Sequence, residues 1–351
     1  MVKRVVFAVP GSLDTPTGGY AYDRRIMAEL RHLGWEVDYL NIGDGFPAAD
    51  EVTRAAARSL LAAIPAGRPI VLDGLALGVL PDVAAELASR HPLVALVHHP
   101  LALESGLTAE RADFLRCSEQ AALAEVRAVV VTSPASAKLV VSGYGVPRNR
   151  ITVARPGNDP VPPLSARQPN DEPHLLSVGS VVPRKGFDIL VLALAMLADI
   201  PWRLMIVGDL TRDPSEAAKL EHLISQHGLS GRIETFGTVA SSRLAVLYAK
   251  ADLFVLASRF EGYGMAYAEA LCHGLPVIGT TAGAIPDTIP QGAGLLVPPD
   301  DPAALAVALR GVIVDTEQRR RLSEAALAAA RTLPTWQESA VVFAATLDRL
   351  A

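Results

Sequence analysis

The chain has 351 residues, of which 50% are hydrophobic, so it is long enough for two domains of ordinary size, each with its own core. The formal net charge of −5 argues against a dedicated nucleic-acid binder, and no apolar run approaches the ~18 residues of a membrane span. The two cysteines, Cys117 and Cys272, indicate neither a disulfide framework nor a metal site, and we expect a protein of the reducing cytoplasm.

The first half of the chain alternates short apolar runs with helical patterns. Alternation of this kind predicts a doubly wound parallel sheet with helices on both faces. The expected strands are 5–9, 36–40, 70–72, 93–97, 128–132 and 151–154, and the expected helices are 21–33, 50–63, 80–90, 109–127 and 134–144.

A second alternation follows a stretch at 158–173 that is rich in Pro, Asn and Asp and that predicts a linker. The sequence therefore predicts an α/β protein with two Rossmann-like parallel-sheet domains that face a cleft, over 1–157 and 174–333, and a last segment at 334–351. The expected strands are 174–178, 202–207, 232–236, 252–257, 276–279 and 294–297, and the expected helices are 186–197, 215–227, 241–249, 265–273, 301–314, 317–331 and 336–350.

The stretch from Ser258 to Gly279 carries the clearest chemical signal, a strand, loop, helix, turn and strand. Two glycines, Gly262 and Gly264, allow a tight turn and a close approach to a ligand before the helix begins. The N–H groups and partial positive charge of the helix N-terminus suit a phosphate. Carboxylates on both sides of it, from Glu261 and Glu269, suit sugar hydroxyls. This pattern indicates a nucleotide-sugar site.

The same stretch resembles one family. Glu261 and Glu269 match the E-x7-E motif of retaining glycosyltransferases of the GT-B fold, family 4 (group 1), within E-G-Y-G-M…E-A-L-C-H-G-L-P-V-I-G. The resemblance implies that Glu269 binds ribose, that Glu261 binds the 3- or 4-hydroxyl of the donor sugar, and that the backbone from Tyr263 to Met265 holds sugar and phosphates. It also implies retention of anomeric configuration and a last helix that crosses back to the first domain. Alone, an E-x7-E spacing would favour two solvated carboxylates at a helix end.

A basic motif follows the first strand of the second half. Gly179 to Gly186 matches the family's G-x-x-x-x-[RK]-K-G motif and places Arg184 and Lys185 just before a helix. Two adjacent cations can stabilise a departing diphosphate. The competing interpretation is an ordinary basic loop at a helix start, although a positive helix end makes that arrangement slightly unfavourable.

Two further candidates lie in the first half. Gly18 and Gly19 form a strand-to-helix turn whose N–H groups suit an anion or a donor sugar, although a simple turn would explain them as well. His98 ends an expected strand and matches an H-x-P pattern of the family. There it would bond the 6-hydroxyl of the donor sugar or help to remove a proton from the acceptor, and the alternative is a turn histidine.

The remaining loops carry weaker signals. Val239 lies in a turn, 236–239, that resembles the family's base-contacting segment, and Leu210 stands where many relatives have a second glycine. Asp73 ends an expected strand on the acceptor side of the first domain. No D-x-D motif occurs, so we expect no metal, and no cofactor beyond the donor.

Taken together, the sequence predicts a metal-independent retaining glycosyltransferase with a nucleoside-diphosphate sugar donor. The alternatives are a GT-B epimerase or hydrolase, which would form product from donor alone, and a non-catalytic binding homologue. A Rossmann dehydrogenase lacks support because the G-x-G-x-x-G fingerprint is missing. The acceptor, a small molecule, glycan or lipid, is not specified by the sequence, nor are the base, the sugar and the oligomeric state, and a peripheral membrane contact stays open.

Overall fold

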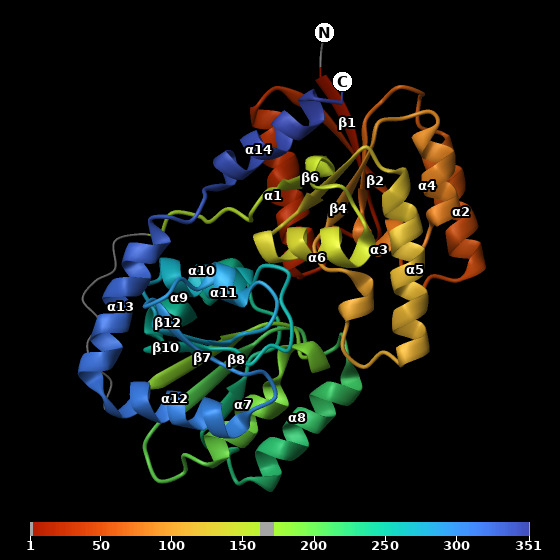
Figure 1. Cartoon of the computed structure of the whole chain (residues 1–351). Helices are drawn as coiled ribbons and strands as arrows, with labels where there is room; N and C mark the ends of the chain where they lie inside the picture. The colour runs from red at the N-terminus through yellow and green to blue at the C-terminus, as the bar shows by residue number, and fades with distance from the viewer. Residues whose placement is uncertain (1–2, 162–171, 351) are drawn as a thin grey trace. The chain divides into compact units, whose positions relative to one another are not determined.

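The computed structural model describes residues 3–161 and 172–350, and the chain divides into two compact units (Figure 1). One unit comprises Met1–Gly157 and Pro334–Ala351, and the other comprises Asn158–Leu333. Most of the stretch expected as a linker, residues 162–171, lies outside the described residues.

The first unit is built on a six-stranded parallel sheet in the order β2-β1-β3-β4-β5-β6. Its inner strands are buried on both faces, which explains why they are continuous apolar runs instead of alternating patterns. The strands are β1 Lys3–Val9, β2 Trp35–Asn41, β3 Ile70–Asp73, β4 Leu93–Val97, β5 Ala128–Val131 and β6 Ile151–Val153. The helices are α1 Gly18–His32, α2 Glu51–Ala62, α3 Gly74–Leu77, α4 Pro81–Ala88, α5 Ala109–Glu125, α6 Pro134–Tyr144 and α14 Trp336–Asp348, with the 3-10 turns η1 Leu101–Leu103 and η2 Arg148–Arg150.

The second unit repeats this plan with the sheet order β12-β11-β10-β7-β8-β9, all parallel. The strands are β7 His174–Val178, β8 Arg203–Val207, β9 Ile233–Thr235, β10 Leu253–Val255, β11 Val277–Thr280 and β12 Gly294–Val297. The helices are α7 Phe187–Ala195, α8 Pro214–Gln226, α9 Ser241–Lys250, α10 Met265–Cys272, α11 Ile285–Thr288, α12 Pro302–Val314 and α13 Thr316–Ala330, with the 3-10 turn η3 Pro183–Lys185.

The last helix, α14, packs on the first unit. It begins with a capping box in which Thr335 and Glu338 bond each other's backbone, and Phe343 stacks on Phe7 of β1 with ring centroids 5.6 Å apart. The hydroxyl of Thr346 lies 2.9 Å from that of Thr152 in β6. Phe7 and Phe343, from opposite ends of the chain, are therefore packed against each other in the first unit.

The prediction of an α/β fold with two parallel sheets is confirmed, and the expected element ends differ by a few residues. Two helices were not expected, α3 and α11, because four residues are too short for a helical pattern to be visible. The helix expected at 21–33 begins earlier, at Gly18, because the side chain of Thr17 caps it by accepting the N–H of Tyr20. None of the helices described here is both long and apolar enough to cross a bilayer.

Glu119 of α5 gives the first unit a stability that depends on pH. Its carboxyl group, 1% exposed, accepts hydrogen bonds from the N–H of Leu101 and from the hydroxyl of Tyr144, and burial raises its pKa to about 8. Because the unfolded value is near 4.5, folding favours the protonated form. This contribution is complete below pH 4.5 and is lost as the pH rises through about 8.

We therefore expect that Glu119→Gln, which keeps the shape but cannot ionise, raises the free energy of unfolding relative to the wild type by about 3 kcal/mol more at pH 8 than at pH 5. Apparent melting temperatures of both proteins at the two pH values measure this difference. An equal effect of the substitution at pH 5 and pH 8 would show that Glu119 does not titrate in this range.

Candidate active site

The order of the strands in the second unit brings two loops together. β7 and β10 are neighbours in the sheet, with Leu175 opposite Leu253, although 78 residues separate His174 from Asp252 in sequence. Parallel strands end at the same edge, which is where open α/β sheets bind ligands. The loop after β7 carries the predicted cations and the loop after β10 carries the first predicted carboxylate.

The structure places Arg184, Lys185 and Glu261 in direct contact. Lys185 Nζ lies 2.7 Å from Glu261 Oε1, and Arg184 Nη1 lies 3.4 Å from Oε2. The hydroxyl of Ser258 donates to Oε1 at 2.6 Å. Burial alone would raise the pKa of Glu261, which is 6% exposed, but the two cations and the Ser258 hydroxyl outweigh it and hold the pKa at about 2. The cluster is therefore ionised at neutral pH and carries two positive charges and one negative charge.

Backbone hydrogen bonds join the same two loops. Arg184 Nη1 also donates to the carbonyl oxygen of Phe260 at 2.9 Å, and the N–H of Arg259 donates to the carbonyl oxygen of Arg184 at 2.8 Å. Each loop thus fixes the position of the other, so the three charged groups are held in place before any ligand binds.

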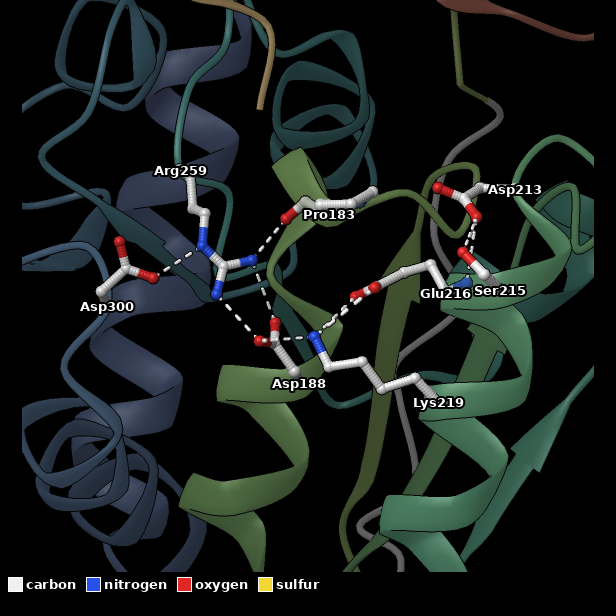
Figure 2. A network of polar contacts seen from close by, with 8 residues as sticks. All are labelled: Pro183, Asp188, Asp213, Ser215, Glu216, Lys219, Arg259 and Asp300. Atoms are coloured by element: carbon white, nitrogen blue, oxygen red, sulfur yellow. Dashed lines mark hydrogen bonds and ion pairs between the residues drawn. The ribbon is translucent and has the colours of Figure 1, made fainter. Parts of the chain in front are cut away.

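Arg259, which no sequence motif marked, joins its own loop to the basic turn η3, to α7 and to Asp300 (Figure 2). Its guanidinium forms a two-pronged pair with Asp188 of α7, at 3.1 and 2.9 Å, and its Nε lies 2.6 Å from Asp300. It also donates to the carbonyl oxygen of Pro183, at the start of the basic turn η3. One side chain therefore ties two separate segments, the stretch 183–188 and the loop at Asp300, to the loop that carries Glu261.

A glycine follows the basic turn because no side chain fits there. Gly186 has φ +65°, and a Cβ atom at this position would overlap the carbonyl oxygen of Ala257, at the end of the β10 segment. Gly228 has nearly the same backbone, φ +67°, but no atom within 4 Å of its Cβ position. The two glycines share a conformation and differ in the space around them.

We expect Gly228→Ala to cost about 1 kcal/mol of unfolding free energy, the penalty of the left-handed backbone, and Gly186→Ala to cost about 3 kcal/mol or more because the two loops must also separate. Urea unfolding of both variants measures the difference. Equal losses would mean that the contact between Gly186 and Ala257 does not fix the loops.

Helix α10 begins at the same sheet edge. Its N-cap, Gly264, has φ +91°, and the first N–H groups after it have no partner within the helix. The carbonyl oxygen of Tyr263 accepts a hydrogen bond from Thr288, and that of Glu261 accepts one from the N–H of Ala284. Hydrogen bonds to these carbonyl oxygens thus hold the segment from Gly262 to Met265, which is predicted to bind the donor. The N-terminus of α10 lies at the end of this segment.

The second predicted carboxylate has a different partner. Glu269 of α10 accepts the hydroxyl of Tyr248 at 2.9 Å, and burial raises the pKa of Glu269 despite this bond. The ring of Tyr248 stacks on that of His273, with centroids 4.8 Å apart. Glu269 is not part of the cluster of Arg184, Lys185 and Glu261, and its ribose-binding role stays a prediction.

The loops after β8 and β9 are joined as well. The N–H of Gly208 donates to the carbonyl oxygen of Gly237 at 2.9 Å. Leu210 and Val239 are half-buried and pack against the core of the unit. Leu210, at the position where relatives often have glycine, therefore fills space beside the core, and base contact by the turn that contains Val239 stays a prediction.

In the first unit, the predicted residues Gly18, Gly19 and His98 lie at the carboxyl edge of that sheet. Gly18 and Gly19 are the first two residues of α1 and not a separate turn. A Cβ atom at Gly19 would lie 3.4 Å from the ring of His98, which follows β4. His98 Nε2 lies 2.9 Å from Asp23 Oδ1 and 3.7 Å from Asp73 Oδ2.

Asp23, Asp73 and His98 are the residues of the described chain that gather three potential ligand atoms within 4.8 Å of one another. A tetrahedral zinc ion with bonds of about 2.0 Å would separate its ligand atoms by about 3.3 Å. The 2.9 Å between His98 Nε2 and Asp23 Oδ1 is instead a hydrogen-bond length. Asp73 Oδ1 is already used, since it accepts the N–H of Leu75 at 2.7 Å and caps α3. We interpret the group as a hydrogen-bonded cluster.

The two parallel six-stranded sheets are those of the GT-B fold, and solved structures show the same fold. Sucrose-phosphate synthase from Thermosynechococcus elongatus is 23% identical, with a TM-score of 0.84 over 99% of both chains. HepE from Anabaena, solved in complex with UDP-glucose, is 20% identical, with a TM-score of 0.79 over 99% of both chains. Residues 165–328 match the family described as glycosyl transferases group 1.

The chain is also similar to curated proteins that are named as enzymes of sugar transfer or synthesis. A D-inositol 3-phosphate glycosyltransferase from Xylanimonas cellulosilytica is 34% identical over 246 residues, which are 66% of this chain and 58% of the relative. Mannosylfructose-phosphate synthase from Agrobacterium fabrum is 28% identical over 225 residues, which are 59% of this chain and 50% of the relative. The chain thus matches about half the length of these relatives.

Proposed function

We propose that the chain is a retaining glycosyltransferase that moves a sugar from a nucleoside-diphosphate sugar to a hydroxyl of an acceptor. The observation that carries this proposal is the cluster of Arg184, Lys185 and Glu261 at one strand edge, beside the N-terminus of α10. Its excess positive charge suits a diphosphate, and its buried carboxylate suits a sugar hydroxyl.

In this proposal the reaction breaks the bond between the sugar C1 and the leaving phosphate oxygen and forms a bond from C1 to the acceptor oxygen on the same face. The acceptor proton passes to the leaving phosphate oxygen, as the family resemblance implies. Arg184 and Lys185 stabilise the charge that develops on the diphosphate, together with the helix N-terminus. Because these groups can supply the positive charge, we propose that no metal is needed.

The pairing of Lys185 with Glu261 has a consequence for donor binding. Before the donor arrives, Lys185 donates to Glu261 at 2.7 Å, so both groups are satisfied. A diphosphate offers Lys185 a second anion, and the carboxylate then becomes available to a sugar hydroxyl. The donor therefore exchanges contacts within an ordered site and does not have to order mobile side chains.

The names of the relatives guide the choice of acceptor. One is a D-inositol 3-phosphate glycosyltransferase and another a mannosylfructose-phosphate synthase. We therefore propose a phosphorylated polyol or sugar as the first acceptor class to test, with D-inositol 3-phosphate as the first compound. The donor panel consists of UDP-, GDP- and ADP-sugars, because HepE was solved with UDP-glucose.

A thermal-shift screen identifies the donor, since a ligand that binds the folded state raises the apparent melting temperature. Transfer is then followed by NMR, which reports the anomeric configuration of the product in the presence of EDTA. We expect the α- or β-configuration of the donor to be kept and EDTA to have no effect. Inverted product would refute retention, and loss of transfer with EDTA would refute the metal-independent mechanism.

The two alternatives have distinct outcomes in the same assay. Product formed from donor alone, at a rate unchanged by any acceptor, would indicate an epimerase or hydrolase. Donor binding without turnover across the acceptor panel would favour a non-catalytic homologue.

A further inference from the structure

The two carboxylates of the candidate site in the second unit have opposite electrostatic environments. Two cations pair with Glu261, whereas no lysine or arginine within residues 3–161 and 172–350 forms an ion pair with Glu269. Burial raises the pKa of Glu269, the hydroxyl of Tyr248 opposes this effect, and the negative charge of Asp159 adds to it. Glu269 is therefore a half-buried carboxylate that depends on neutral hydrogen-bond donors.

Tyr248 of α9 supplies such a donor from a fixed position. It is 2% exposed, and its ring stacks on that of His273 with centroids 4.8 Å apart and an angle of 9° between the planes. Its hydroxyl lies 2.9 Å from Glu269 Oε2 and 3.3 Å from the carbonyl oxygen of Ala266. Because a phenol has one proton to donate, the shorter contact with the charged acceptor takes it.

This bond leaves most of the carboxylate available to a ligand. A carboxylate accepts about four hydrogen bonds, and Tyr248 uses one of them, on Oε2. Oε1 of Glu269 accepts none from the described part of the chain and is not enclosed by it. A ligand with two neighbouring hydroxyls and no charge matches a carboxylate of this kind. The ribose of a nucleoside diphosphate has this chemistry.

We propose that Tyr248 is a positioning residue, which holds Glu269 in one orientation so that its remaining lone pairs accept the two hydroxyls of ribose. This inference rests on the proposed function, in which the second unit holds a nucleoside diphosphate. Without the bond from Tyr248, the carboxylate would be free to rotate and would have to be ordered when the nucleotide binds. Tyr248 therefore acts on the ligand through Glu269 and does not touch it.

The test compares the affinities of UDP, GDP and ADP with those of their 2′,3′-dideoxy forms, by calorimetry on the full chain. For the nucleotide that binds most tightly, we expect the wild type to prefer the ribose form by at least about tenfold. In Tyr248→Phe, which removes only the hydroxyl, the preference should fall to about threefold or less. A wild type without this preference, or an unchanged preference in Tyr248→Phe, would overturn the proposal.

A double variant shows whether Tyr248 acts through Glu269. Glu269→Gln should weaken the ribose preference on its own, because the charged acceptor is gone. Adding Tyr248→Phe to Glu269→Gln should then have no further effect on the preference, since residues that act as one unit are not additive. Additive losses in the double variant would mean that Tyr248 acts on the nucleotide by another route.

Tyr144→Phe is the matched control. Tyr144, which is 6% exposed, bonds the buried carboxyl group of Glu119 in the first unit, so this pair has the same chemistry away from the nucleotide loops of the second unit. We expect Tyr144→Phe and Tyr248→Phe to lower the apparent melting temperature to similar extents. The ribose preference should stay at its wild-type value in Tyr144→Phe. An equal loss of preference in both variants would reduce the role of Tyr248 to stability.

A second measurement keeps the test decisive if Tyr248→Phe does not fold. Tyrosine labelled with 13C at the ζ carbon gives an NMR signal that reports the hydrogen bond of its hydroxyl. We expect the ribose form of the nucleotide, but not the dideoxy form, to move one tyrosine signal, the same one that Glu269→Gln moves. Binding that leaves this signal in place would contradict the proposal.

Transfer separates this inference from the proposed function. A ribose preference that depends on Tyr248, in a protein that transfers no sugar to any acceptor, would refute the proposed function and leave the role of Tyr248 intact. Transfer with no preference for the ribose form would refute the role of Tyr248 and leave the proposed function intact. Three nucleotides that bind no better than inorganic pyrophosphate would refute the inference as well.

Discussion

Replacing Lys185 with methionine is expected to lower the rate of sugar transfer by about a hundredfold or more, comparable to the loss of one preorganised donor in other enzymes. Methionine keeps the length and apolar stem of lysine and removes only the charge. The measured quantity is kcat with saturating donor. Lys250, an exposed residue at the end of α9, offers a matched surface control, Lys250→Met, for which we expect wild-type activity.

The same substitution separates stability from catalysis. The pKa of Glu261 is held at about 2 against an ordinary value of 4.5, so its ionised form contributes stability that is complete above pH 4.5 and is lost as the pH falls through 2. Lys185→Met removes part of this, about 1–3 kcal/mol at pH 7. Adding Glu261→Gln should restore most of the stability, because no unpaired buried charge remains, but should not restore transfer. Recovery of activity in the double variant would show that the pair is structural only.

Arg259→Lys is expected to have the second-largest effect. Lysine keeps the charge but cannot bond both oxygens of Asp188, Asp300 and the carbonyl oxygen of Pro183 at once. We expect a loss of about 2–3 kcal/mol in unfolding free energy, as for other partly buried two-pronged pairs. We also expect kcat to fall by about tenfold or more, since the basic turn loses its fixed position relative to Glu261.

Arg310 provides the matched control for this prediction. It forms a similar two-pronged pair with Asp199, at 2.8 and 2.6 Å, but both side chains are exposed. Arg310→Lys should leave kcat unchanged and stability nearly so. Equal effects of the two substitutions on kcat would mean that the contacts of Arg259 matter no more for catalysis than those of an ordinary surface ion pair.

The parts of the fold that the sequence predicts best are those whose burial is uniform. β4 occupies the residues expected for it, 93–97, because an apolar run buried on both faces ends abruptly at the polar His98. Helix α6 likewise lies at 134–144, between the cap Ser133 and the left-handed Gly145. In both cases local chemistry marks the ends, so no knowledge of tertiary contacts is needed.

The contact between Lys185 and Glu261 could be predicted from the sequence because each residue lies in a motif that follows a strand. The contacts of Asp23 with His98 and of Arg259 with Asp188 could not, because no motif marks Asp23, Arg259 or Asp188, although the separations of 75 and 71 residues are similar to the 76 residues between Lys185 and Glu261. Only the order of the strands decides which loops meet, and that order is set by the packing of the whole sheet. Positioning residues are therefore harder to predict than the residues they position.

The most direct measurement of the central claim is the affinity of the wild-type protein and of Lys185→Met for a nucleoside diphosphate and for the matching monophosphate. If the cations recognise the second phosphate, the wild type should bind the diphosphate at least about tenfold more tightly than the monophosphate, and this preference should largely disappear in the variant. An equal preference in both proteins, measured by calorimetry at the same ionic strength, would contradict the assignment of Lys185 and Arg184 to the donor.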